Sequence, residues 1–327
     1  MTGPFGLHTS MSGRFGVLAL LLYVLLRGLD ATALKGLQLA GASHLVLGEN
    51  PISFCNVFFF SQLVVGLVAL LPARQTLPRE LAALSTADRC LLALDAGLGL
   101  FLGPIAYYLA LQALSVVSQT LLFALVLPLS ALLARWLLGE PLPRGFALSL
   151  GLIAAGLLLP QVASAAMGGP MDDRVGIGWA LVGVAAFSSA AITGRTIAGR
   201  SWPVAVSVGV PSLLTALVFA LIALVLFGPH HFLLLQLWWV VGVIGVYAVV
   251  LSLGRELCLR LAYRHSSVAM VSLWGSLSLP VAVVSAALLL QEPLSFQAVL
   301  GLALVLAGAF WSSAPGQSDR PPQRYLP

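Results

Sequence analysis

LPLSALLARWLLGEPL at residues 127–142 matches LPVAVVSAALLLQEPL at residues 279–294, an offset of 152 residues. The matching leucines carry little information in so leucine-rich a chain. Shared prolines, glycines and glutamates carry more, because the chain has only 11 acidic residues. These informative pairs are Pro128 with Pro280, Glu140 with Glu292, Pro141 with Pro293, and Gly156 with Gly308. A match at a fixed offset indicates an internal duplication.

The composition around this repeat excludes a water-soluble globule. Of the 327 residues, 60% are hydrophobic and 8% are charged, and the mean hydropathy is +1.03. Too few charged side chains exist to cover a soluble surface. Apolar runs of about 20 residues recur, and each can cross roughly 30 Å of hydrocarbon as a helix. Membrane β-strands would be shorter and alternating. The sequence therefore predicts an all-α integral membrane protein.

The apolar runs predict ten transmembrane helices, at residues 15–37, 52–71, 90–111, 115–137, 145–161, 175–197, 203–227, 237–258, 266–290 and 295–313. The repeat divides them into a first five-helix copy at 15–161 and a second at 175–313, joined by a linker at 162–174. Residues 1–14 and 314–327 are terminal segments. Because five is odd, the second copy enters the bilayer from the opposite side. The copies are then inverted repeats with a cavity between them.

The basic residues predict an orientation. With both termini in the cytoplasm, thirteen of the 16 basic residues lie on the cytoplasmic side, Lys35 and Arg174 lie outside, and Arg27 lies within a span. This bias is typical of a multi-pass protein of the cell (inner) membrane with both ends inside. Topology explains these scattered positive charges, so we predict no nucleic-acid partner.

Several features resemble the EamA-type transporters of the drug/metabolite transporter superfamily: the two five-helix copies, the Pro-Leu segment of each fourth helix, the LGEPL and LQEPL junctions, and the Gly-rich fifth helices. The resemblance covers nearly the whole chain. It implies a secondary carrier, commonly an exporter of amino acids, other metabolites or toxic compounds. It names a class of function and no particular substrate.

Charged side chains inside the spans are the first candidates for contact with a solute or proton, because an ionised group is costly at membrane depth. Arg27 and Asp30 lie about midway along the first span and can pair on one face of the helix. They can bind the two ends of a zwitterionic solute, or Asp30 can carry a coupling proton. An ion pair that only packs the bundle is the alternative. Asp95, inside the third span, either faces the cavity or pairs with an Arg of another helix.

Aromatic and proline residues add further candidates. Tyr247 and Trp274 lie well inside spans of the second copy and suit an aromatic cavity wall, although the serines near Trp274 also permit close helix packing. Pro128 and Pro280 lie inside spans, where the missing N–H bends a helix. Such a bend provides either simple curvature or the flexing point of a gate.

The Glu-Pro pairs at 140–141 and 292–293 each lie between two spans. Proline is favoured at a helix start, and glutamate interacts with the positive end of the following helix. We therefore interpret Glu140, Pro141, Glu292 and Pro293 as markers of structural turns, with a gate as the alternative.

The sequence contains no convincing catalytic or metal motif. His230-His231 has no further ligand nearby, and the three cysteines lack paired spacing. We predict no enzyme activity, no metal and no cofactor; the partners are the bilayer and a small solute, with proton coupling and a homodimer left open. Two rival classes are an intramembrane enzyme acting on lipid-like substrates and a non-transporting membrane scaffold.

Overall fold

The computed structural model describes residues 11–46, 48–139, 142, 145–166, 174–200, 202–265 and 274–312. Within these ranges the elements are helices, and one isolated backbone bridge joins Val46 to Glu49. Up to residue 166 the elements are α1 (Met11–Ser43), α2 (Phe54–Leu70), η1 (Leu71–Ala73), α3 (Leu77–Ala83), α4 (Thr86–Asp95), η2 (Ala96–Leu102), α5 (Gly103–Ala113), α6 (Val116–Phe123), α7 (Val126–Leu138) and α8 (Phe146–Ala166).

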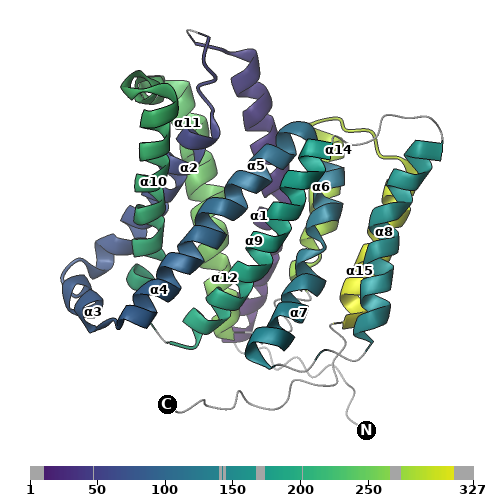
Figure 1. The fold of residues 1–327 in the computed structure, drawn as a ribbon, viewed down its shortest axis with the longest axis horizontal. Helices are drawn as coiled ribbons and strands as arrows, with labels where there is room; N and C mark the ends of the chain where they lie inside the picture. The colour runs from purple at the N-terminus through teal and green to yellow at the C-terminus, as the bar shows by residue number, and fades with distance from the viewer. Residues whose placement is uncertain are drawn as a thin grey trace.

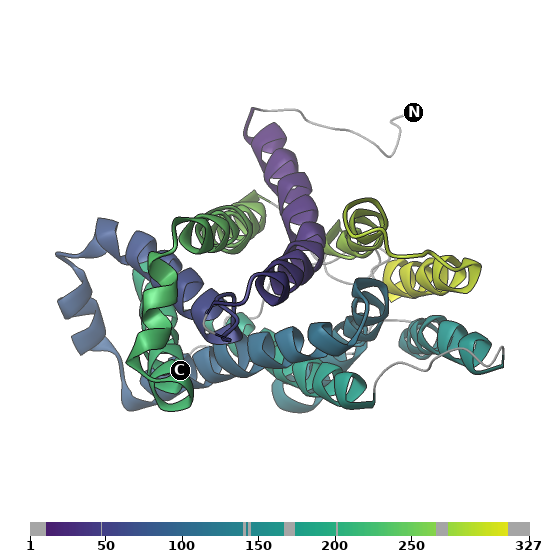
Figure 2. The ribbon, with the colours of Figure 1, turned by 90° about the horizontal axis from the view of Figure 1, so that it is seen from above.

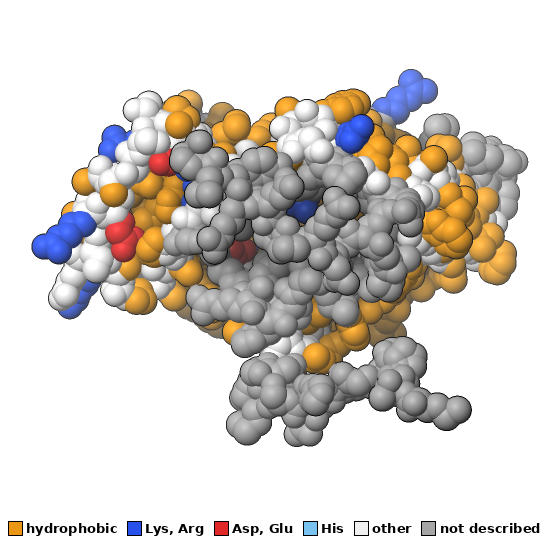
Figure 3. Space-filling model, turned by 90° about the horizontal axis from the view of Figure 1, so that it is seen from below, with side chains coloured by type: hydrophobic (Ala, Val, Ile, Leu, Met, Phe, Trp, Pro, Cys, Tyr) orange, Lys and Arg blue, Asp and Glu red, His pale blue; other side chains and the backbone are white. Residues whose placement is uncertain are grey.

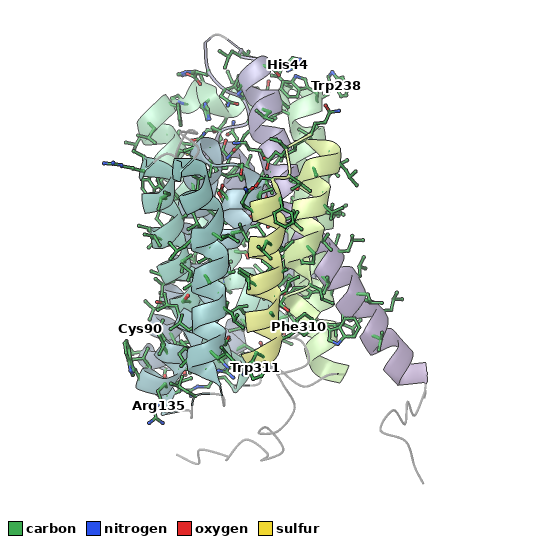
Figure 4. The ribbon with its side chains drawn as sticks, turned by 90° about the vertical axis from the view of Figure 1, so that its right-hand side faces the viewer. His44, Cys90, Arg135, Trp238, Phe310 and Trp311 are labelled. Carbon is green, nitrogen blue, oxygen red and sulfur yellow. The ribbon has the colours of Figure 1, made fainter. Side chains whose placement is uncertain are left out.

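From residue 174 onward the elements are α9 (Arg174–Ala198), η3 (Ala205–Gly209), α10 (Val210–Phe227), η4 (Pro229–Gln236), α11 (Trp238–Val246), η5 (Tyr247–Leu253), α12 (Gly254–His265), α14 (Ser278–Leu289) and α15 (Phe296–Ser312). The long helices stand side by side as one bundle (Figure 1). Figure 4 shows His44 and Trp238 at one end of this bundle and Cys90, Arg135 and Trp311 at the other. We call these the His44 end and the Arg135 end.

The bundle has the surface of a membrane protein. Seven helical runs in the described chain are long and apolar enough to cross a membrane, and three shorter apolar helices, at 146–159, 274–289 and 296–311, accompany them. Large apolar side chains such as Trp136, Val225 and Phe296 are mostly exposed. Figure 3 looks at the bundle from below and shows hydrophobic side chains around the edges of the view. Lipid, unlike water, solvates such a surface well. The predicted all-helical membrane class is confirmed.

The helix boundaries differ from the expected spans in places. α1 continues to Ser43 and α8 to Ala166, beyond the predicted ends at 37 and 161. The segment 72–89, expected to be a loop, contains α3 and the start of α4. Ser85 and Asp88 form a capping box that starts α4 early, each side chain binding the other residue's backbone N–H. Of the expected linker, residues 167–173 lie outside the described residues.

Pro128 and Pro280 lie at matching breaks in their helices. A turn at residues 124–125 separates α6 from α7, and a turn at residues 276–277 precedes α14, 152 residues later. A proline has no N–H for the carbonyl four residues before it. The carbonyls of Ala124 and Ser276 instead accept the N–H three residues further on, at 3.2 and 3.1 Å. The same local geometry therefore occurs at both prolines.

Two π-helical segments also match within one residue of the repeat offset. η2 follows Asp95, between α4 and α5, and η5 begins at Tyr247, between α11 and α12. Such segments are often found at functional sites. They draw attention to Asp95 and Tyr247, which lie 152 residues apart.

Close helix contacts set the positions of the spans. α8 packs along α15, and α2 packs along α10. A Cβ atom added to Gly156 would lie 2.5 Å from the Gly301 carbonyl oxygen, and one added to Gly308 would lie 2.8 Å from that of Ser149. Only glycine permits this approach between α8 and α15. Viewed from above, α1 passes between the α12 and α14 regions (Figure 2) and contacts both helices.

Candidate functional site

The central polar contact of the bundle joins α1 to α12. Arg255 Nη1 donates to Asp30 Oδ2 at 2.7 Å. The Asp30 side chain is 16% exposed and that of Arg255 is 36% exposed, so the pair is largely withdrawn from the surface. Asp30 Oδ1 is buried and makes no hydrogen bond within the described part of the chain. One carboxylate oxygen is thus bound by the guanidinium, and the other retains its capacity to accept a donor.

Two tyrosines from other helices accompany this ion pair. Tyr247 is buried at the start of η5, and Tyr107 projects from α5. Both hydroxyls lie within electrostatic range of Asp30 and of Arg255. We call Asp30, Arg255, Tyr107 and Tyr247 the Asp30 cluster. It combines a negative group, a positive group and two hydroxyls at the contact of three helical runs.

Arg27 does not pair with Asp30, which corrects the expected pairing. Arg27 Nη1 donates to the Tyr23 hydroxyl at 2.8 Å, and its guanidinium lies 5.9 Å from the centre of the Tyr23 ring. Arg27 is exposed, whereas Asp30 lies farther around α1 and is directed toward α12. Trp274 packs with Tyr23 in a separate apolar cluster. The structure therefore brings Tyr247 to Asp30 and places Trp274 with Tyr23, the partner of Arg27.

Asp95 belongs to another helix contact. It ends α4 and accepts a hydrogen bond from the hydroxyl of Thr193, a buried residue of α9. Asp95 therefore makes an interhelical contact, and this contact includes a hydroxyl donor, whereas the alternative from the sequence was an Arg partner. Asp95 also makes further interactions.

The residue that sequence reasoning missed is Arg255. The described part of α12 extends from Gly254 to His265, so Arg255 lies more than two turns before the end of the helix. The sequence feature that could have identified Arg255 is its position inside an apolar helical run. An arginine at membrane depth needs an acidic partner. The chain separates Arg255 from Asp30 by 225 positions, and no local pattern links them.

Glu292 binds a different helix from the one expected. Its Oε1 accepts the Val116 N–H at 2.9 Å and its Oε2 accepts the Val117 N–H at 3.3 Å, at the start of α6. The following helix, α15, has its own cap, because Ser295 Oγ accepts the Ala298 N–H at 3.1 Å. The carboxylate is therefore available for the distant helix. Pro293 lies exposed between α14 and α15, whereas Glu140 and Pro141 lie outside the described residues.

A second polar cluster lies at the His44 end. Glu49 Oε2 is 2.7 Å from His231 Nδ1, Glu49 Oε1 is 2.7 Å from His230 Nε2, and His231 Nε2 is 2.9 Å from Ser53 Oγ. Phe227 stacks on the His231 ring at 4.2 Å. We call these four polar residues the Glu49 clasp, because they join η4 to the segment between α1 and α2.

The Glu49 clasp orders hydroxyl, imidazole and carboxylate as a hydrolase triad does. Ser53 is buried, however, and its oxygen already caps α2 by accepting the Asn56 N–H, while His231 is fully buried. The clasp therefore fastens the end of the bundle. The two histidines hold the pKa of Glu49 below its ordinary value by hydrogen bonding to the carboxylate. Among the residues with a described position, no group of three His, Cys, Asp or Glu is arranged to hold a metal ion.

No protein-family model matches the chain. The chain is similar to an uncharacterized transporter, sll1164, of Synechocystis sp. (strain ATCC 27184 / PCC 6803 / Kazusa), with 27% identity over 285 residues, or 83% of this chain and 79% of that protein. A crystal structure of a protein with 20% sequence identity shares the fold, with a TM-score of 0.55 over 92% of this chain and 96% of that one. Both similarities extend over most of the chain. The apolar helices and the similarity to a transporter together indicate an integral, multi-pass membrane protein.

Proposed function

We propose that the protein is a secondary transporter that moves a small organic solute across a membrane by alternating access. The observation that carries this proposal is the Asp30–Arg255 ion pair between two helices of a membrane bundle, beside Tyr247 and Tyr107. Ionised groups at this depth are costly, and they mark solute or proton pathways. The similarity to a transporter supports the same class of function.

The proposed architecture is ten spans in two inverted copies, in which the three shorter apolar helices also cross the membrane. The matching breaks before Pro128 and Pro280 support it, and so does the pattern of helix contacts. α1 packs on α12 and α14, while α9 packs on the α4–α5 and α6–α7 runs. A two-fold axis between the copies would produce these reciprocal contacts. Inverted copies provide two similar states, each open to one side.

The Asp30 cluster suits a zwitterion such as an amino acid, or an amphipathic compound with one charged end. An ammonium group would bind Asp30 and a carboxylate would bind Arg255, because Asp30 and Arg255 already offer each other these complementary charges. The alternative role of Asp30 is to carry a coupling proton. Arg27, Asp95 and Trp274 stay proposed contacts of the same pathway. By analogy with EamA-type carriers, we propose export, with both termini in the cytoplasm.

Uptake into proteoliposomes tests the proposal. Purified protein is reconstituted and offered a panel of labelled amino acids and amphipathic compounds, with and without a pH gradient. Asp30→Asn and Arg255→Met should abolish uptake of the accepted solute. Glu80→Gln on α3 and Arg89→Met, an exposed residue of α4, are the matched charge controls and should retain it. If folded parent protein moves no solute, the proposal is wrong, and turnover of membrane lipids followed by mass spectrometry would then test the enzyme class.

A further inference from the structure

The turn between α5 and α6 is held by two side chains of opposite charge. Lys35 of α1 donates from Nζ to the carbonyl oxygen of Leu111 and, at 3.1 Å, to that of Leu114. Glu292 accepts the backbone N–H groups of Val116 and Val117. The ammonium group therefore binds the negative end of α5, and the carboxylate binds the positive end of α6.

These two charges also attract each other. Glu292 lies within electrostatic range of Lys35, and both residues are half-buried. Hydrogen bonds to ionised groups are stronger than those between neutral groups, and more so where water is partly excluded. The contact at this turn is thus a network of four hydrogen bonds and one attraction between charges.

The network joins parts of the chain that are far apart. Lys35 and the α5–α6 turn belong to residues 15–161, whereas Glu292 belongs to residues 175–313. The turn lies toward the His44 end of the bundle, where α5 ends and α6 begins (Figure 1). Beyond it, α6 runs only from Val116 to Phe123 before the break at 124–125. α6 is therefore a short helix held by Glu292 at one end and interrupted at the other.

We propose that Glu292 and Lys35 form a latch that closes the His44 end, and that this end opens when Glu292 leaves the N-terminus of α6. The proposal rests on the alternating-access function proposed above. In the closed state Glu292 satisfies two backbone donors of α6, and departure exposes them to water. α6 then tilts at the 124–125 break, and the space behind it becomes accessible from the His44 end.

Cysteine accessibility tests the latch. The native cysteines 55, 90 and 258 are replaced by alanine or serine, and Thr120→Cys places a reporter thiol on a buried position of α6. The protein is embedded in lipid nanodiscs, and its labelling rate with a charged, membrane-impermeant maleimide is measured. Glu292→Gln should raise this rate about tenfold or more, as expected from the loss of charge-assisted hydrogen bonds. Glu80→Gln removes a carboxylate of α3, away from this turn, and should leave the rate unchanged.

A second variant removes one of the two hydrogen bonds of Glu292 without a charge change. Val116→Pro deletes the N–H that Glu292 Oε1 accepts, at the first helical position, where proline is favoured. Ser115 before it already has an extended backbone, with φ −70° and ψ 158°, which is compatible with a following proline. Val116→Pro should raise the labelling rate as Glu292→Gln does. If Glu292→Gln fails to fold, the labelling rate of Val116→Pro tests the latch instead.

Labelling at the parent rate in both folded variants would overturn the latch. Labelling that responds in a protein that moves no solute would leave the latch intact and remove the proposed transport function. The two proposals can therefore fail separately.

Discussion

The α1–α12 contact and the α4–α9 contact occupy equivalent places in the two proposed copies, yet their chemistry differs. In the proposed architecture, each joins the first helix of one copy to the third helical run of the other, beside a π-helical segment. At α1–α12, Asp30 binds the guanidinium of Arg255. At α4–α9, Asp95 accepts a hydrogen bond from the hydroxyl of Thr193. One contact is an ion pair, and the other includes a hydroxyl donor.

The two contacts therefore share backbone features but differ in the charge of their side chains. The backbone features that the copies share, which are the breaks and the π-helical segments, follow from packing and proline positions. Side-chain charge is not shared, because Arg255 corresponds at the repeat offset to Gly103. The Asp30–Arg255 pair presents a negative and a positive group side by side. The charged contact is therefore the better candidate for solute recognition.

Among the variants at these two contacts, removal of Arg255 should have the largest effect on stability and transport. Arg255→Met leaves Asp30 as an uncompensated charge inside the bundle. We expect a loss of about 2–3 kcal/mol of stability, less than for a fully buried pair because the Arg255 side chain is 36% exposed. Thermal unfolding in detergent measures it. The double variant Asp30→Asn with Arg255→Met should recover most of the stability and no transport, and a double variant as unstable as Arg255→Met would contradict the ion-pair account.

Thr193→Val makes the corresponding change at α4–α9. It removes one donor to Asp95 while preserving the shape of the side chain, so we expect a loss of about 1–2 kcal/mol. Transport should continue, in contrast to the result with Arg255→Met. The same unfolding and uptake measurements check both expectations. Loss of uptake in folded Thr193→Val would show that the two contacts are functionally alike.

A smaller contrast concerns the turn that follows each broken helix. Gly139 and Gln291 occupy matching positions and both have positive φ, at 68° and 54°. Nothing lies within 4 Å of a Cβ added at Gly139, so Gly139→Ala should cost only the backbone strain of about 1 kcal/mol. Gln291→Gly should relieve such strain and stabilise the second copy by up to about 1 kcal/mol. Unfolding temperatures that shift in the same direction for both variants would refute this.

The repeat explains which parts of the fold could be predicted. Pro128 and Pro280 each interrupt their own helix because proline has no N–H. Their matching positions in the sequence therefore predict matching helix breaks. The π-helical segments could not be predicted, because no residue type specifies the extra residue in a turn. The lengthened α4 was in principle readable from the Ser85 and Asp88 capping box.

The candidate site was predicted only where the signal was local. Asp30 stood out because a carboxylate at membrane depth is costly, and its environment is polar as expected. Its partner, Arg255, depends on how α12 packs against α1, which local spacing does not encode. Glu292 and His231 illustrate the same limit: one caps a helix of the other copy, and the other is buried against Glu49 and Ser53. Such pairings arise from tertiary packing.

The Glu49 clasp is a polar contact outside the spans. We expect its loss to have the smallest effect on stability. Hydrogen bonds from His230 and His231 lower the pKa of Glu49 below its ordinary value of 4.5. Because the folded-state pKa is depressed, the stabilisation is complete above that ordinary value and is lost as the pH falls through the lower, folded-state pKa. The unfolding temperature of the parent should therefore fall more steeply below about pH 4.5 than that of Glu49→Gln, which has no carboxylate to protonate. Glu80→Gln, away from the clasp, should keep the parent's acid slope. Equal slopes in the parent and Glu49→Gln would mean that the clasp contributes packing alone, whereas the Asp30–Arg255 contact would still depend on its charges.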